Sequence, residues 1–215
     1  MKTIAVIPAR GGSKGVPKKN IVDLAGFPLI FYSINTALNA FGKVYVSTDC
    51  DEIATIARSF GAQVIKRPVE LASDTATDYD WLKHVISVVD CENVAILRPT
   101  TPLRCATEVL KGLELFENNT GCTSMRSAHE APESPYKWFE KEYEGKYWKK
   151  NPLADMPRQA LPKIYIPNGY LDITRRETIE KGSAYGEKIL SFITESVVEV
   201  DAQEALDYLE YTIKK

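Results

Sequence analysis

Residues 4–20 read IAVIPARGGSKGVPKKN. The apolar, partly β-branched run at residues 4–7 is typical of a strand buried in a parallel sheet. It leads directly into a loop in which three glycines let the backbone bend closely around a ligand. Because Arg10 and three lysines share that loop, the stretch predicts a phosphate-binding site at the end of a first strand. The alternative is a solvated basic turn.

Apolar runs and amphipathic helical patterns alternate along the next eighty residues. They predict helices at residues 30–38, 52–60 and 79–89, and strands at residues 43–47, 62–66 and 94–97. Strands separated by helices of this length indicate β-α-β units, and therefore an α/β fold with a doubly wound, mostly parallel sheet. Ligands bind at the carboxyl ends of strands in such sheets, so we expect Arg10, Asp49 and residues 98–104 around one crevice.

The segment at residues 130–163 interrupts this alternation with five prolines and a cluster of aromatic and charged side chains. Large amphipathic rings are common at protein interfaces, so the segment predicts a protruding arm that joins a homodimer. A hairpin folded back on its own domain is the alternative. The chain is expected to form a single domain over residues 1–215. After the arm the pattern predicts strands near 164–166 and at 196–200, a turn at Asn168-Gly169, and helices near 176–181 and from Ala202.

The composition is that of an ordinary globular protein, with 44% hydrophobic and 26% charged residues and a net charge of −2. This charge argues against a nucleic-acid-coating surface. The sequence contains neither an apolar signal segment nor a run of the ~20 apolar residues that span a bilayer, so a cytoplasmic location without membrane contact is expected. Four cysteines without C-x-x-C spacing predict neither a zinc site nor a disulfide framework.

The loop contains neither the Walker motif nor the G-x-G-x-x-G fingerprint. Residues 7–20 instead closely resemble the opening motif of the N-acylneuraminate cytidylyltransferases, the CMP-sialic acid synthetases. Later segments resemble that family in the same order along nearly the whole chain: Val46 to Asp49, Arg67 to Asp74, Pro99 to Arg104, Arg158 to Pro162, Asn168-Gly169, and Val198 to Asp201.

The resemblance implies a Rossmann-like nucleotidyltransferase that transfers CMP from CTP to the anomeric hydroxyl of a sialic-acid-like sugar acid and releases pyrophosphate. It assigns the nucleotide to Ala9, Arg10, Gly11, Gly12, Ser13, Lys14, Lys19, Asn20, Arg67, Glu70 and Asp74, and the acceptor to Arg98, Thr100, Arg104, Arg158, Asn168, Asp172 and Tyr185. Arg10, Lys14, Lys19 and Asp201 are the candidate catalytic residues.

A divalent cation, Mg²⁺, is expected at Asp201 and Glu199, since this ion prefers a few carboxylates together with substrate phosphates. Alternation in the predicted strand at 196–200 would place both carboxylates on one face. The family usually has Asp where this chain has Glu199.

Two departures from the family concern the acceptor. Arg98 replaces a glutamine, and the residues after Asn168-Gly169 include Asp172. A guanidinium recognises a carboxylate or phosphate through a bidentate fork, so a sugar 1-phosphate acceptor with GTP or CTP is an alternative. Arg98 in a structural salt bridge with Asp172 is another. A non-catalytic nucleotide-binding module is the alternative from a different class of protein.

Two further residues have alternative interpretations. Arg67 fits either the nucleoside site or a surface turn. Asp49 fits either the metal and ribose or a cap on the following helix.

Overall fold

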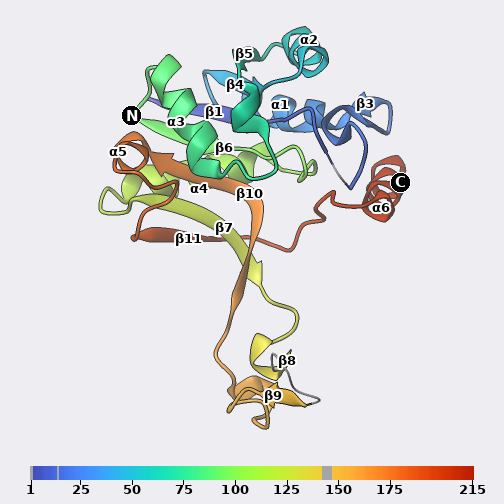
Figure 1. Ribbon diagram of the computed structural model, residues 1–215, viewed down its shortest axis with the longest axis vertical. Helices are drawn as coiled ribbons and strands as arrows, with labels where there is room; N and C mark the ends of the chain where they lie inside the picture. Colours follow the sequence, from blue (N-terminus) through green and yellow to red (C-terminus); the bar gives the residue numbers. More distant parts are fainter. Residues whose placement is uncertain (1, 14, 142–146) are drawn as a thin grey trace.

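The computed structural model describes residues 2–13, 15–141 and 147–215, and its centre is a seven-stranded sheet (Figure 1). The strand order is β11-β7-β10-β6-β1-β4-β5. The strands are β1 (Thr3–Pro8), β4 (Val44–Thr48), β5 (Gln63–Lys66), β6 (Asn93–Ile96), β7 (Ser124–Glu130), β10 (Tyr165–Arg175) and β11 (Ile189–Ile193). Every neighbouring pair is parallel except the two that β10 makes with β6 and β7. The predicted mostly parallel α/β sheet is therefore confirmed.

Helices cover both faces of this sheet. One face packs against α1 (Leu29–Ala40), α2 (Asp51–Ser59) and α4 (Ala106–Asn118), and the other against α3 (Asp78–Val88) and α5 (Arg176–Glu180). Ala5 and Ile7 of β1 belong to the first core, whereas Ile4 and Val6 belong to the second, and all four are fully buried. A strand with two buried faces needs a continuous apolar run, which explains the opening sequence.

A third, smaller core lies beside the glycine-rich loop. The loop is followed by the short elements η1 (Lys19–Ile21), β2 (Asp23–Leu24) and β3 (Phe27–Pro28), and the C-terminal helix α6 (Gln203–Lys214) packs against this region. Its buried members are Val16, Leu24, Leu29, Val200, Leu206 and Leu209. The C-terminal helix α6 is thereby packed next to the loop.

The secondary structure predicted for residues 30–97 is confirmed to within two residues at each boundary. The predicted strand at 196–200 is wrong, because residues 194–202 have no regular structure and the strand β11 precedes them. Of the valines that suggested a strand, Val200 is buried by α6 and not by a neighbouring strand. The sequence analysis also did not predict α4 or β7.

The dipeptide Asn168-Gly169 is not a turn but a bulge within the eleven-residue strand β10. Gly169 adopts a φ of 61°, a left-handed conformation that glycine takes without strain.

The arm projects away from the sheet on the outer ends of β7 and β10 (Figure 1). It contains η3 (Pro135–Lys137), β8 (Phe139–Lys141), β9 (Trp148–Lys150) and η4 (Arg158–Ala160). Trp138, Phe139, Tyr147 and Trp148 expose between 58% and 76% of their surface there. The segment therefore does not fold back on its own domain, and it presents apolar surface to solvent.

The four cysteines are free, as expected. Among the described residues, no helix combines the length and the apolar character that are needed to cross a membrane.

Candidate functional site

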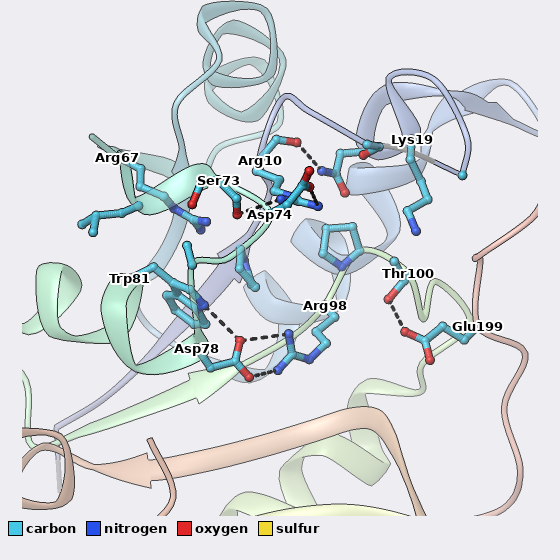
Figure 2. Close-up of a pocket in the computed structure, with 17 residues that line it drawn as sticks. Arg10, Lys19, Arg67, Ser73, Asp74, Asp78, Trp81, Arg98, Thr100 and Glu199 are labelled. Carbon is cyan, nitrogen blue, oxygen red and sulfur yellow. Dashed lines mark hydrogen bonds and ion pairs between the residues drawn. The ribbon is translucent and has the colours of Figure 1, made fainter. Parts of the chain in front are cut away.

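A cavity of about 470 Å³ opens where β1, β5 and β6 end (Figure 2). Three sequence segments, together with Glu199, line it. The glycine-rich loop contributes Arg10, Ser13, Gly15, Lys19 and Asn20, the segment after β5 contributes Arg67, Asp74, Asp78 and Trp81, and the segment after β6 contributes Arg98 and Thr100. The volume is within the usual range for a small-molecule site. The expectation that residues after separate strands surround one crevice is confirmed for Arg10, Arg98 and Thr100, but not for Asp49, which does not line the cavity.

Hydrogen bonds to the rest of the protein fix the shape of the glycine-rich loop. The amide of Gly11 donates to Asp49 Oδ1 at 2.9 Å, and Asn20 Nδ2 donates to the carbonyl of Arg10 at 2.9 Å. A side chain at position 11 would lie 3.0 Å from Cys50 Cβ. Asp49 therefore holds the loop, and the alternative that it caps α2 is wrong, because Cys50 occupies the N-cap without a side-chain bond.

Arg10 and Lys19 of the loop face the cavity, whereas Lys18 points to Glu52, 2.7 Å away. Arg10 Nη2 lies 2.9 Å from Asp74 Oδ1, and Arg10 Nη1 donates to the carbonyl of Ser73. Lys19 Nζ donates to the carbonyl of Val200 at 3.0 Å. Since Asp74 is half exposed, its ion pair with Arg10 is weak and can open to a competing anion. Lys14, the third predicted cation, lies outside the described residues.

The segment before α6 lies at the edge of the cavity, where Glu199 lines it. The amide of Val200 donates to the carbonyl of Thr100 at 2.7 Å, and Thr100 Oγ1 donates to Glu199 Oε1 at 2.9 Å. Glu199 consequently lines the cavity, while Asp201 lies on the other side of the fixed Val200 and does not line it. The argument that strand alternation places both carboxylates on one face is therefore wrong.

Only Glu199 of these two carboxylates lines the cavity, but both are accessible to a cation from solvent. Both side chains are exposed, and they flank a backbone position that is bonded to Thr100 and Lys19. The described residues contain no group of three His, Cys, Asp or Glu side chains arranged to hold a metal. One or two carboxylates are the usual protein contribution to a Mg²⁺ that also binds substrate phosphates.

Arg67 lies inside the protein and not in a surface turn. Its Nε donates to Ser47 Oγ at 3.0 Å, its Nη2 donates to the Ser47 carbonyl at 2.9 Å, and its guanidinium lies 5.5 Å from the ring centre of Trp81. Burial lowers the pKa of Arg67 to about 10, so the side chain is a cation at neutral pH. Glu70, in η2 (Val69–Ala72), is exposed and does not line the cavity.

Arg98 is paired with Asp78, a residue that the sequence analysis did not identify. The two Arg98 nitrogens Nη1 and Nη2 donate to the two carboxylate oxygens at 3.3 and 2.6 Å. Asp78 also accepts from Trp81 Nε1 at 3.1 Å and from the Tyr185 hydroxyl at 2.8 Å. Burial opposes the ionisation of Asp78, but the charge of Arg98 and these hydrogen bonds outweigh it and keep the pKa of Asp78 below its usual value.

The proposed Arg98–Asp172 salt bridge is a minor contact. Arg98 Nη2 lies 3.9 Å from Asp172 Oδ2, compared with 2.6 Å to Asp78. Asp172 is 1% exposed and lies behind Arg98, and burial raises its pKa although Arg126 and Arg98 oppose the shift. Tyr185, another predicted acceptor residue, is within hydrogen-bond distance of both Asp78 and Asp172.

Three further predicted acceptor residues do not line the cavity. Arg104 is buried and donates to backbone carbonyls of Arg98, Gly169 and Tyr170. Asn168 donates to Thr194 Oγ1 at 2.7 Å. Arg158 lies in the arm, where it donates to the carbonyl of Pro132. Arg104 thus holds the backbone of Arg98, and Asn168 holds β10 to Thr194, whereas Arg158 lies in the arm.

The loop and the segment before α6 also lie close together at Gly15. A Cβ at this position would lie 2.6 Å from the carbonyl oxygen of Asp201, which is closer than a carbon atom can approach a backbone oxygen. We predict that Gly15→Ala displaces Glu199 and Asp201 from the loop and lowers turnover at least tenfold with less than about 1.5 kcal/mol loss of stability. Steady-state kinetics and chemical denaturation measure the two effects. Gly42→Ala is the control, because nothing lies within 4 Å of its Cβ position and Gly42 precedes β4, away from the cavity. Equal turnover of the two variants would contradict the importance of this contact.

Comparison with known proteins agrees with this geometry. Residues 4–154 match the family model described as Cytidylyltransferase. Over its full length the chain is 31% identical to an N-acylneuraminate cytidylyltransferase of Escherichia coli O18:K1:H7, of which it covers 52%. It is 36% identical over 83% of its length to an N-acylneuraminate cytidylyltransferase of Streptococcus agalactiae serotype V, of which it covers 44%. The chain therefore spans about half the length of these relatives.

Two other comparisons extend over nearly the whole of both proteins. The post-translational flagellin modification protein B of Campylobacter coli is 32% identical over 99% of this chain and 95% of its own length. A solved CMP:2-keto-3-deoxy-manno-octonic acid synthetase, complexed with CTP, has a TM-score of 0.79 over 100% of this chain and 99% of its own. At 19% identity, the solved structure shows that the fold is shared. The chain belongs to the cytidylyltransferase family.

Proposed function

We propose that the protein transfers CMP from CTP to the anomeric hydroxyl of a sialic-acid-like sugar acid. The observation that carries this proposal is the convergence of Arg10, Lys19, Arg67 and Arg98 on one cavity at the carboxyl ends of the strands. Family membership and the names of the relatives support the choice of CTP and of a sugar acid. In the reaction the acceptor oxygen attacks the α-phosphorus, the bond to the β-phosphate breaks, and pyrophosphate leaves.

The cavity offers separate places for the parts of this reaction. The triphosphate fits against the loop, where Lys19 and Arg10 face the cavity and Arg10 can exchange its partner Asp74 for a phosphate. The nucleoside fits near Arg67 and Trp81. Catalysis then depends on holding the acceptor oxygen, the phosphorus and the leaving oxygen in line while cations stabilise the phosphate charge.

A sugar 1-phosphate acceptor receives less support from the structure than from the sequence. Arg98 was the reason to consider a phosphate at the acceptor site, but both of its Nη nitrogens already donate to Asp78. The guanidinium charge is thereby compensated before any substrate binds. A neutral pair attracts a dianionic phosphate far less than a free arginine does.

The proposal includes a divalent cation, Mg²⁺, at Asp201 and Glu199. Such an ion supplies charge stabilisation to the phosphates and to the acceptor oxygen. The chain's own contribution is to place the two carboxylates through the bonds of Val200 to Thr100 and Lys19. A cytoplasmic location, where CTP is available, remains part of the proposal.

A homodimer through the arm is also proposed. The exposed rings of Trp138, Phe139, Tyr147 and Trp148 form an apolar surface of the kind that interfaces bury. Arg158 lies in the same arm, so it can act on an acceptor only if the arm reaches the cavity of a second copy.

Release of pyrophosphate tests the proposed reaction. The four ribonucleoside triphosphates are each combined with sialic-type sugar acids and with hexosamine 1-phosphates in the presence of Mg²⁺. We predict release only with CTP and a sugar acid, and none after addition of EDTA. Release with a sugar 1-phosphate, or with GTP, would show that the acceptor or donor is different. No release with any pair would favour a nucleotide-binding module.

Light scattering tests the dimer. We predict that Trp138→Glu combined with Trp148→Glu converts a dimer to a monomer, because carboxylates would replace two exposed rings of the arm. Tyr208→Glu combined with Tyr211→Glu is the matched control, since these α6 side chains are equally exposed and far from the arm. A dimer that survives the Trp138 and Trp148 changes would exclude this surface as the interface.

A further inference from the structure

The acceptor side of the cavity is closed by an ion pair whose two members both line it (Figure 2). The Nη1 and Nη2 atoms of Arg98 donate to the two carboxylate oxygens of Asp78, and about a quarter of each side chain is exposed. Asp78 accepts four hydrogen bonds, from both Arg98 nitrogens, Trp81 and Tyr185. We refer to Asp78, Arg98 and Tyr185 as the acceptor wall.

Residues behind the acceptor wall hold it in place. Arg98 Nη2 lies 3.2 Å from the Tyr185 hydroxyl, and the Arg126 guanidinium stacks 4.3 Å from the centre of the Tyr185 ring. Arg126 Nη2 also lies 3.5 Å from the buried Asp172. Arg98 therefore cannot turn toward a substrate without breaking contacts with both Asp78 and Tyr185.

The acceptor wall can still donate hydrogen bonds to a ligand, although it carries little net charge. The positive charge of Arg98 is matched by the negative charge of Asp78, so a carboxylate in the cavity gains little attraction from either residue. Asp78 already accepts four bonds. Arg98, however, uses one hydrogen of Nη1 for Asp78, and its Nε makes no hydrogen bond among the described residues. Donors remain available on an electrically neutral surface.

We propose that the Arg98–Asp78 pair determines acceptor specificity by donating to an uncharged oxygen of the acceptor, a hydroxyl or an acyl carbonyl, and does not bind its carboxylate. This inference rests on the proposed function and names the part of the acceptor that the wall recognises. If Arg98 bound the carboxylate, it would leave Asp78 partly buried and uncompensated, which is a costly arrangement.

A double-mutant cycle tests this inference in the full-length protein. Arg98→Gln, Asp78→Asn and the double variant are compared with the wild type for the KM of the sugar acid and the KM of CTP in the pyrophosphate assay. Each single change leaves one uncompensated charge in the wall, so we expect the acceptor KM to rise about tenfold or more. The double change removes both charges and retains an amide donor, so its acceptor KM should lie closer to the wild type than that of either single variant. The KM of CTP should change less than about twofold throughout.

Arg176 and Glu180 provide a matched control. They form an arginine–carboxylate pair at 2.7 Å on α5, and neither residue lines the cavity. Arg176→Gln, Glu180→Gln and their combination should leave both constants unchanged. Thermal unfolding of every variant separates loss of fold from loss of acceptor binding.

Other results would overturn the inference. Equal impairment of Arg98→Gln and the double variant, with Asp78→Asn unchanged or tighter, would identify Arg98 as the carboxylate receptor. If a single variant does not fold, the double variant and the wild type are compared with two sugar acids that differ by one hydroxyl or acyl group. An unchanged selectivity ratio would also overturn the inference.

Absence of CTP-dependent release from the wild type with every sugar acid would instead overturn the proposed function, and the inference with it.

Discussion

The conformation of the glycine-rich loop is the constraint on which the site depends. The loop must leave β1, turn around a ligand and return to the core, and it does so through the bonds from Gly11 to Asp49 and from Asn20 to the Arg10 carbonyl. Lys19 then connects the loop to Val200, more than 180 residues later in the chain. Because Val200 is bonded to Thr100 as well, three distant segments share one arrangement of hydrogen bonds. A phosphate bound in the loop would therefore influence the positions of all three segments.

Charge pairing gives the two sides of the cavity different properties. On the loop side, Lys19 donates to a backbone carbonyl, and the pair of Arg10 with Asp74 is exposed to solvent. This side can present positive charge to a polyanion. On the acceptor side, Arg98 is neutralised by Asp78 and fixed by Tyr185. The structure thus separates a surface suited to phosphates from a surface suited to neutral polar groups.

The sequence could predict what depends on local pattern. The buried strand, the loop glycines and the alternation of helices and strands follow from periodicity and composition, and they suffice to place Arg10, Arg98 and Thr100 around one cavity. Asp78 was missed because its role depends on a partner twenty residues away, at the end of another strand. The strand expected at 196–200 was wrong because Val200 is buried by a helix that follows it. Arg104 and Asn168 match the family motif, yet their bonds support the backbone and do not reach the cavity.

The most direct test of the account is a crystal structure of the protein with CTP and Mg²⁺. The account predicts that the triphosphate lies against Arg10 and Lys19, that Asp74 releases Arg10, and that the ion binds between the phosphates and the carboxylates of Glu199 and Asp201. It also predicts that Arg98 remains paired with Asp78. A triphosphate bound elsewhere, with the glycine-rich loop unoccupied, would contradict the central claim that this loop is the phosphate site.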